Sequence, residues 1–212
     1  MSPLKTGCFA ISLIACLASV PLPLHAQEIG WYGGASAGLS NVAVTEDFWS
    51  DSSISKASIQ TSGFGYGLYA GYRFNPRFAL EVNYLQAADT AFHATSNGSL
   101  TLWPAGQVSG TTLNDGIALS GLLFWPARAS RVQLYLKGGL FFWDTTARYS
   151  NTVNAYNEFN DNGTSPIGGA GIQLQLAHQW NLRVEALYSM VQLAGRASVG
   201  VSFAFAGISR SF

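Results

Sequence analysis

The sequence predicts an all-β protein, an eight-stranded antiparallel up-and-down transmembrane β-barrel, and three observations lead to this prediction. Apolar and polar residues alternate with a period of two along much of the chain, as they do in strands with two different faces. Only 10% of the 212 residues are charged, against about 25% in a typical soluble domain. Short and long connections alternate between the expected strands, which is typical of barrels that cross a membrane.

The first 26 residues have the features of a secretory signal peptide. Lys5 supplies the positive charge, an apolar stretch follows, and Ala26 offers a small residue at the cleavage point. We therefore expect a cleaved signal peptide over 1–26 and an outer-membrane barrel domain over 27–212. The alternative is a lipoprotein signal that ends at Cys16, which is disfavoured because the residues after Cys16 are apolar and not a polar tether.

Six segments alternate cleanly enough to be expected as strands. In each, the apolar set is expected to face lipid and the polar or small set to face the lumen. In the last segment this expectation places Val199, Val201, Phe203 and Phe205 on the lipid side. The six segments are 64–74, 78–84, 132–137, 169–176, 181–188 and 198–205.

Two weaker segments complete the count of eight. Residues 31–39 are rich in glycine, and residues 117–125 are apolar on both faces, so the orientation of the second segment stays open. Aromatic residues near the strand ends are expected to form two girdles at the membrane surfaces. The girdle residues at the short-turn rim are Trp31, Phe74, Phe78, Trp125 and Trp180, and those at the long-loop rim are Phe64, Phe141, Phe142 and Trp143.

The connections give the direction of the barrel. Short turns are expected at 75–77, 126–131 and 178–180, and long loops at 40–61, 88–115 and 148–165. Short turns at one rim and long loops at the other place the short turns in the periplasm and the long loops outside the cell.

A soluble barrel of the lipocalin type would show the same alternation with its apolar face inward. Two observations argue against a soluble barrel. The expected inner faces carry charged residues, and the chain has too few charges to cover a solvated outer surface. The inward charges are Arg73, Glu81, Lys137, Arg183 and Glu185. The three-residue turn at 75–77 places Glu81 opposite Gly71 and diagonal to Arg73.

These five residues are candidates for one lumenal polar network. An eight-stranded barrel is just wide enough for its own side chains, so we expect the network to plug the lumen. A narrow small-solute channel, porin-like, is the alternative.

Four segments together are typical of one family of membrane barrels. They are Gly30-Trp31-Tyr32-Gly33-Gly34, Gly67-Leu68-Tyr69-Ala70-Gly71-Tyr72-Arg73-Phe74, Leu80-Glu81-Val82-Asn83-Tyr84 and Val199-Gly200-Val201-Ser202-Phe203-Ala204-Phe205. These segments resemble the OmpA-like and OmpX-like small outer-membrane barrels. The resemblance implies a bacterial outer-membrane location, contact with outer-membrane lipid and lipopolysaccharide, and insertion by the barrel-assembly machinery. It also implies that this machinery reads an aromatic residue at the end of the last strand, for which Phe205 and Phe212 are the candidates.

Catalysis is not expected. Barrel enzymes of the PagL type, which deacylate lipid A, use a His-x-Ser motif, and the sequences after His93 and His178 both depart from it. A lipid A-modifying enzyme is therefore the least favoured function. No cofactor or metal motif is found, and the formal net charge of zero gives no indication of nucleic-acid binding.

The long loops are acidic and contain aromatic residues, which commonly anchor protein interfaces. We therefore expect a structural or surface-interaction role, with an extracellular partner bound through these loops. The candidate loop aromatics are Phe48, Trp49, Trp103, Tyr156 and Phe159.

Overall fold

The computed structural model describes most of the chain after the expected signal peptide. The described ranges are 29–43, 54–99, 105–126, 131–151, 157–177, 179–193 and 197–212. The expected signal peptide over 1–26 lies outside them, as do His178 and four of the loop aromatics, Phe48, Trp49, Trp103 and Tyr156. No helix within these ranges is long and apolar enough to cross a membrane.

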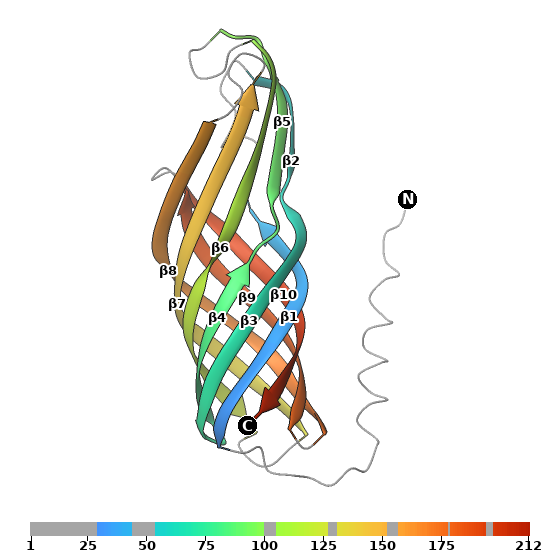
Figure 1. Ribbon diagram of the computed structural model, residues 1–212, viewed down its shortest axis with the longest axis vertical. Helices are drawn as coiled ribbons and strands as arrows, with labels where there is room; N and C mark the ends of the chain where they lie inside the picture. The colour runs from blue at the N-terminus through green and yellow to red at the C-terminus, as the bar shows by residue number, and fades with distance from the viewer. Residues whose placement is uncertain are drawn as a thin grey trace.

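The described ranges contain ten strands (Figure 1). They are β1 (Gly30–Val42), β2 (Ile54–Gln60), β3 (Ser62–Asn75), β4 (Phe78–Gln86), β5 (Thr90–Ser96), β6 (Gly106–Trp125), β7 (Val132–Asn151), β8 (Asn157–Ala177), β9 (Trp180–Leu193) and β10 (Ala197–Ser211).

Eight of these strands form a closed antiparallel ring in the order β1-β3-β4-β6-β7-β8-β9-β10. The ring closes because β1 pairs with β10 from Tyr32↔Ser211 to Val42↔Val201. Closure satisfies the backbone donors and acceptors that a sheet edge would leave open, as a bilayer requires. The predicted eight-stranded up-and-down barrel is confirmed, and segments 31–39 and 117–125 both belong to the ring.

The turn between β3 and β4 sets the register of the first polar residues in the lumen. The Asn75 side-chain oxygen accepts hydrogen bonds from the backbone N–H groups of Arg77 (2.8 Å) and Phe78 (3.0 Å). This short turn pairs Gly71 with Glu81, as the sequence predicts.

Close contact between neighbouring strands depends on glycine at some positions. A Cβ added at Gly139 would collide with the Leu119 carbonyl on β6, whereas one at Gly138 would meet no atom within 4 Å.

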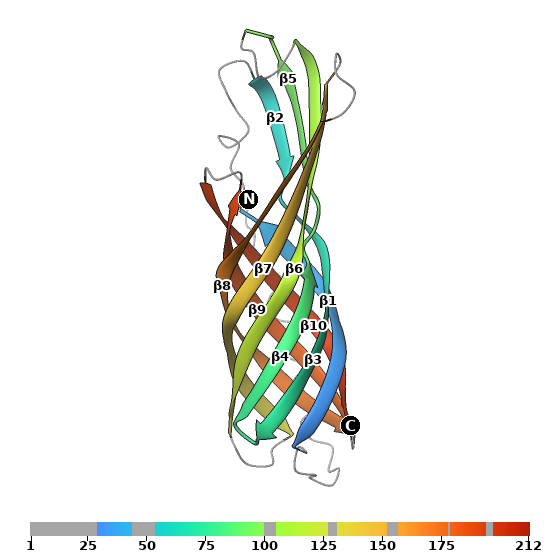
Figure 2. The same ribbon diagram turned by 60° about the vertical axis from the view of Figure 1, so that its left-hand side comes forward.

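A smaller extension of the same sheet rises from one side of the ring and is called the overhang here (Figures 1 and 2). It consists of β2, β5 and the far ends of β6, β7 and β8, in that order. The cross-strand partners Thr90↔Thr112, Thr112↔Ala147 and Ala147↔Phe159 mark its base.

The long loops predicted at 88–115 and 148–165 are therefore largely strands, and those predictions are wrong. Ser, Thr and Asn in these stretches give no apolar alternation, yet the backbone pairs as regularly as in the ring.

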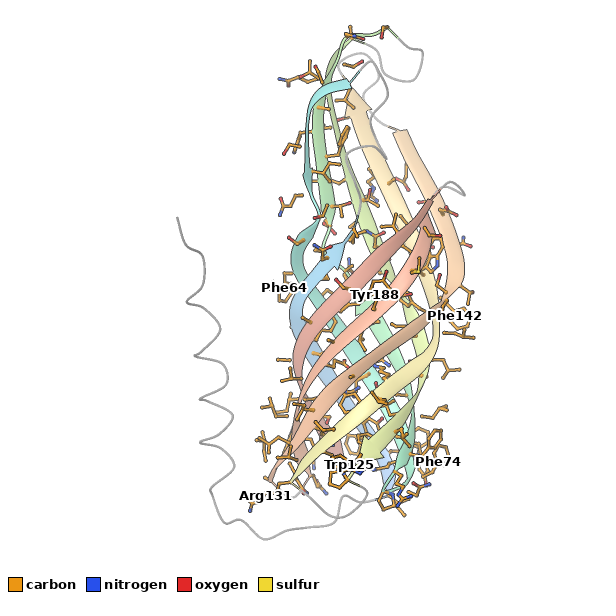
Figure 3. The ribbon with its side chains drawn as sticks, turned by 180° about the vertical axis from the view of Figure 1, so that it is seen from behind. Phe64, Phe74, Trp125, Arg131, Phe142 and Tyr188 are labelled. Atoms are coloured by element: carbon orange, nitrogen blue, oxygen red, sulfur yellow. The ribbon has the colours of Figure 1, made fainter. Side chains whose placement is uncertain are left out.

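Large apolar and aromatic side chains cover the outer surface of the ring. Trp125 at the short-turn end is 69% exposed, and Phe74 lies near it, whereas Phe64, Phe142 and Tyr188 lie higher up the barrel (Figure 3). Two residues expected in the upper girdle, Phe141 and Trp143, instead point inward and are buried. The expectation failed because three consecutive aromatic residues in a strand cannot all share one face.

The orientations of β6 and β10 are now defined. In β6, Ile117, Leu119, Leu123 and Trp125 face outward, whereas Leu122 and Phe124 are buried. In β10 the predicted orientation is wrong. Val199, Val201, Phe203 and Phe205 are all buried inside the barrel, and the small residues between them face outward.

Candidate functional site

Four of the five predicted lumenal charges meet in the lower half of the barrel interior. Both terminal nitrogens of Arg183 on β9 bind Glu81 on β4, at 2.6 and 3.1 Å. Nη2 of Arg183 also donates to Glu185 (2.9 Å). Lys137 Nζ on β7 lies 2.8 Å from Glu81 and 3.6 Å from Glu185. These side chains are almost completely buried, so two cations and two anions neutralise one another across the lumen.

Tyrosines complete this network on both sides of Arg183. The Tyr135 hydroxyl accepts from Arg183 Nε (2.6 Å) and donates to Glu185 (3.1 Å). Tyr32 donates from β1 to Glu81 (2.9 Å). The Arg183 guanidinium lies 4.6 Å from the ring centroids of both Tyr69 and Tyr135. Charge-assisted hydrogen bonds of this kind are stronger than neutral ones, and here they tie β1, β4, β7 and β9 together through the lumen.

Arg73 does not join the network, and its predicted place there is wrong. It lies nearer the short-turn end, where its guanidinium donates to the carbonyls of Asn75 (3.4 Å) and Pro76 (2.9 Å) and to Gln133 Oε1 (2.9 Å). The guanidinium also lies 4.0 Å from the centre of the Phe124 ring. Glu81 faces Gly71 and is turned towards Arg183 and Lys137, so the diagonal position predicted from the turn does not produce a contact.

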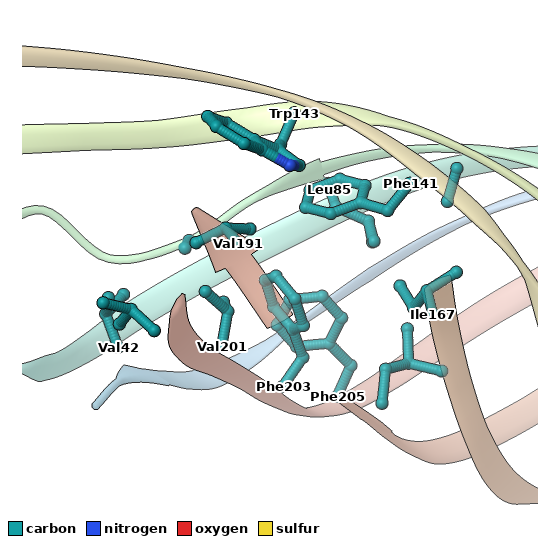
Figure 4. Packing of buried hydrophobic residues seen from close by; sticks show 13 residues of the cluster. Val42, Leu85, Phe141, Trp143, Ile167, Val191, Val201, Phe203 and Phe205 are labelled. Atoms are coloured by element: carbon teal, nitrogen blue, oxygen red, sulfur yellow. The ribbon is translucent and has the colours of Figure 1, made fainter. Parts of the chain in front are cut away.

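Apolar side chains pack together in another part of the interior (Figure 4). Phe203 and Phe205 lie against each other, with ring centroids 5.4 Å apart. The Trp143 indole N–H is satisfied by Ser165 Oγ at 3.0 Å. Phe205 stands opposite Glu185 in the strand register, so the apolar cluster begins directly where the charged network ends. The cluster comprises Val42, Leu85, Ala87, Ala118, Phe141, Trp143, Ile167, Leu187, Val191, Val199, Val201, Phe203 and Phe205.

The tyrosines and glutamine of the lumen were not among the predicted site residues, although the sequence carried a signal for them. Tyr135 stands between Gln133 and Lys137 on the polar face of its strand, and Tyr69 stands between Gly67 and Gly71 on the inward face of its own. A tyrosine on the polar face of a barrel strand indicates a hydroxyl that bonds to lumenal charges.

The two candidates for the assembly signal have different positions. Phe205 lies in the middle of β10 and points into the barrel. Phe212 directly follows β10, is 70% exposed, and donates its backbone N–H to the Trp31 carbonyl (2.9 Å). The last strand therefore ends at Ser211, directly before Phe212, and Phe205 does not close it.

Two further predicted residues lie on the overhang. His93 is exposed on β5, and within the described ranges its side chain makes no hydrogen bond to a nucleophile. Phe159 is part of β8, where it pairs with Ala147 on β7.

The closed ring, the charged interior and the apolar exterior agree with the comparison of sequences. The profile of the outer membrane protein beta-barrel domain family matches residues 12–209. The chain belongs to this family. As an outer membrane protein beta-barrel domain, it is located in the bacterial outer membrane.

Solved structures of outer-membrane barrels have the same fold. Neisserial surface protein A is 16% identical with a TM-score of 0.53, over 86% of this chain and 97% of that one. The attachment invasion locus protein Ail of Yersinia pestis is 18% identical with a TM-score of 0.50, over 87% of this chain and 100% of that one. At this identity the likeness extends to the fold alone. A search of curated protein sequences gives no match.

Proposed function

We propose that this outer membrane protein beta-barrel domain is a sealed membrane anchor that presents the overhang to a partner outside the cell. It acts without catalysis and without transport. The observation that carries the proposal is the overhang itself. On one side only, β6, β7 and β8 continue beyond the ring and form a sheet with β2 and β5, which anchoring in the membrane does not require.

The contents of the lumen support the sealed state. Glu81, Lys137, Arg183 and Glu185 cross the lower lumen and bond to one another. Directly above them, buried aromatic and branched apolar side chains contact one another. An ion that crosses the barrel has to break the salt bridges and then pass an apolar layer. Both steps are unfavourable, since a charge in an apolar medium is strongly destabilised.

The two faces and the two edges of the overhang support surface interaction. One face is buried at Phe92, Ala94 and Val108, and the other exposes polar residues such as Thr95 and Thr111. In the described part of the chain β2 pairs only with β5, and the pairing of β8 with β9 begins only at Ile167. Both outer edges therefore offer backbone donors and acceptors, which bind extended segments of other proteins by strand addition.

Conductance in a planar lipid bilayer tests the sealed state. We expect the purified full barrel to give no steady openings over a range of voltages. Steady openings that are lost when Phe205 is replaced by Trp would overturn the sealed state and favour the narrow small-solute channel.

Two loop replacements test the surface interaction. In the overhang variant, Asn-Gly replaces residues 91–111 and joins the cross-strand partners Thr90 and Thr112 in a two-residue hairpin turn. In the matched control, Asn-Gly replaces residues 97–105 and joins Ser96 to Gly106, which removes only the tip. Bacteria that display each protein are tested for adhesion to cultured epithelial cells and to immobilised extracellular-matrix proteins.

We expect the overhang variant to lose adhesion and the tip variant to keep it. Loss in both variants would assign the interaction to the loop that carries Trp103 and contradict a role for the sheet. Adhesion that is equal in all three proteins and in cells without the barrel would overturn the interaction itself.

A further inference from the structure

Arg73 is a buried cation whose charge has no counterpart. Lys137 and Arg183 are balanced by Glu81 and Glu185, which leaves Arg73 as one positive charge in excess among the described interior residues. The Arg73 side chain is inside the barrel, with the residue only 4% exposed. Within the described ranges it forms no ion pair, and its hydrogen bonds from Nε and Nη2 all go to neutral oxygens.

A small cavity adjoins Arg73 at the short-turn end of the lumen. It has a volume of about 20 Å³ and is lined by polar side chains and the Phe124 ring. That volume holds one water-sized species, and chloride is only slightly larger than water. The lining includes hydroxyl and amide donors but no carboxylate. The polar lining residues are Tyr32, Arg73, Gln173, Asn181, Ser209 and Ser211.

We propose that this cavity binds one small monovalent inorganic anion of about the size of chloride. Burial of a charge is unfavourable unless the charge is paired, and one monovalent anion beside Arg73 makes the described interior neutral. Because the Tyr32 hydroxyl donates to Glu81, the hydrogen bonds that a desolvated anion needs come from the hydroxyls of Ser209 and Ser211 and the amide of Gln173. A cation is disfavoured by the same guanidinium. This inference concerns the end of the barrel opposite the overhang and does not depend on the proposed function.

Diffraction from bromide-containing crystals tests the site directly. Crystals of the full barrel are grown in detergent with sodium bromide, and anomalous scattering locates the bromide. We expect a peak between Arg73 and Ser209 in the wild-type protein and no peak there in Arg73→Gln. Density for a water molecule alone, with no anomalous signal, would overturn the proposal, as would a peak that persists in Arg73→Gln.

Thermal unfolding in detergent micelles tests the site in solution. Sodium chloride is compared with sodium gluconate at the same ionic strength, because gluconate is too bulky for the cavity. A ligand that binds only the folded state raises the unfolding midpoint, and we expect chloride to raise that of the wild type by roughly 3 °C in a saturable manner.

Two variants separate the site from a general salt effect. Arg77→Gln removes an exposed arginine from the same turn and is expected to keep the chloride effect, whereas Arg73→Gln is expected to abolish it. Ser209→Ala keeps Arg73 and removes one cavity hydroxyl, and it is expected to raise the chloride concentration that gives half the effect. A chloride effect of the same size in all four proteins would overturn the proposal.

Discussion

At the scale of single residues, the lumen shows which charges a membrane barrel tolerates in its interior. Glu81 receives hydrogen bonds from Arg183, Lys137 and Tyr32, so its buried carboxylate is surrounded by donors. Removal of one partner from a buried ion pair leaves an uncompensated charge and is far more costly than the pair is stabilising. The network therefore makes the barrel sensitive to single substitutions that change charge but not shape.

Glu81→Gln is expected to reduce the free energy of unfolding by about 3–5 kcal/mol, because Lys137 and Arg183 then face each other with one carboxylate fewer. Urea titration of the barrel in detergent, followed by tryptophan fluorescence, measures the change. Glu158→Gln is the control, since Glu158 pairs with Arg148 at 3.4 Å on the exposed surface, where such pairs contribute less than about 1 kcal/mol. Equal losses in the two variants would contradict the network.

At this scale, part of the site was predictable from the sequence. Alternation identified Glu81, Lys137, Arg183 and Glu185 as inward residues, and their similar distances from the short turns predicted that they meet. It did not separate Arg73 from them, because its height in the lumen depends on strand tilt and on the carbonyls of the turn at Asn75 and Pro76. Strand tilt and the position of these carbonyls are properties of the folded backbone, and the residue pattern of a single strand does not predict them.

At the scale of the strand, β10 explains why apolar alternation does not give direction in a membrane barrel. In a soluble barrel only the interior is apolar, so an apolar face points inward. Here both lipid and the upper lumen are apolar, and Phe203 and Phe205 point into the lumen while Ala204 and Ala206 face outward. The predicted strand was present, but its orientation required the register with β9, in which Phe205 lies opposite Glu185.

Phe205 within β10 and Phe212 directly after it are predicted to affect different properties, namely the stability of the folded barrel and its assembly in cells. Phe205→Ala is expected to reduce the free energy of unfolding by about 3–5 kcal/mol, because it opens a cavity in the apolar cluster. We propose that Phe212 is the aromatic residue read by the barrel-assembly machinery, so Phe212→Ala is expected to change stability little and to lower the amount of folded barrel in cells.

Refolding of both variants from urea and heat-modifiable migration of membrane fractions on gels measure the two effects. A Phe212→Ala protein that reaches the outer membrane as well as the wild type would remove Phe212 from assembly. A stable Phe205→Ala protein would mean that the cluster contributes little to the fold.

At the scale of the whole molecule, the barrel has an apolar outside and a partly polar inside. The outer surface carries exposed aromatic residues at two levels (Figure 3), and the charged network lies in the lower lumen. The low content of charged residues predicted this arrangement, because lipid replaces water around the ring. The overhang was not predicted, since its strands are polar and give no signal of apolar periodicity.

The fluorescence of two tryptophans tests separately which side chains face the lipid and which face the lumen. Trp125 is exposed on the outer surface, whereas Trp143 is only 5% exposed and points into the barrel. In vesicles of lipids with brominated acyl chains, a variant that keeps only Trp125 is expected to be quenched several times more strongly than one that keeps only Trp143, with the other tryptophans replaced by Phe. Comparable quenching of both would contradict the inward position of Trp143.

The sequence distances within the lumenal network have a consequence for how the protein forms. Glu81 and Arg183 are 102 residues apart in the chain, and Lys137 is 56 residues from Glu81. Contacts between such distant residues form late, because the entropy of closing long loops opposes them. Until β9 joins the ring, Glu81 lacks the two hydrogen bonds from Arg183, so we expect its carboxylate to keep part of its hydration. Loss of water from the lumen is therefore expected to accompany closure of the ring.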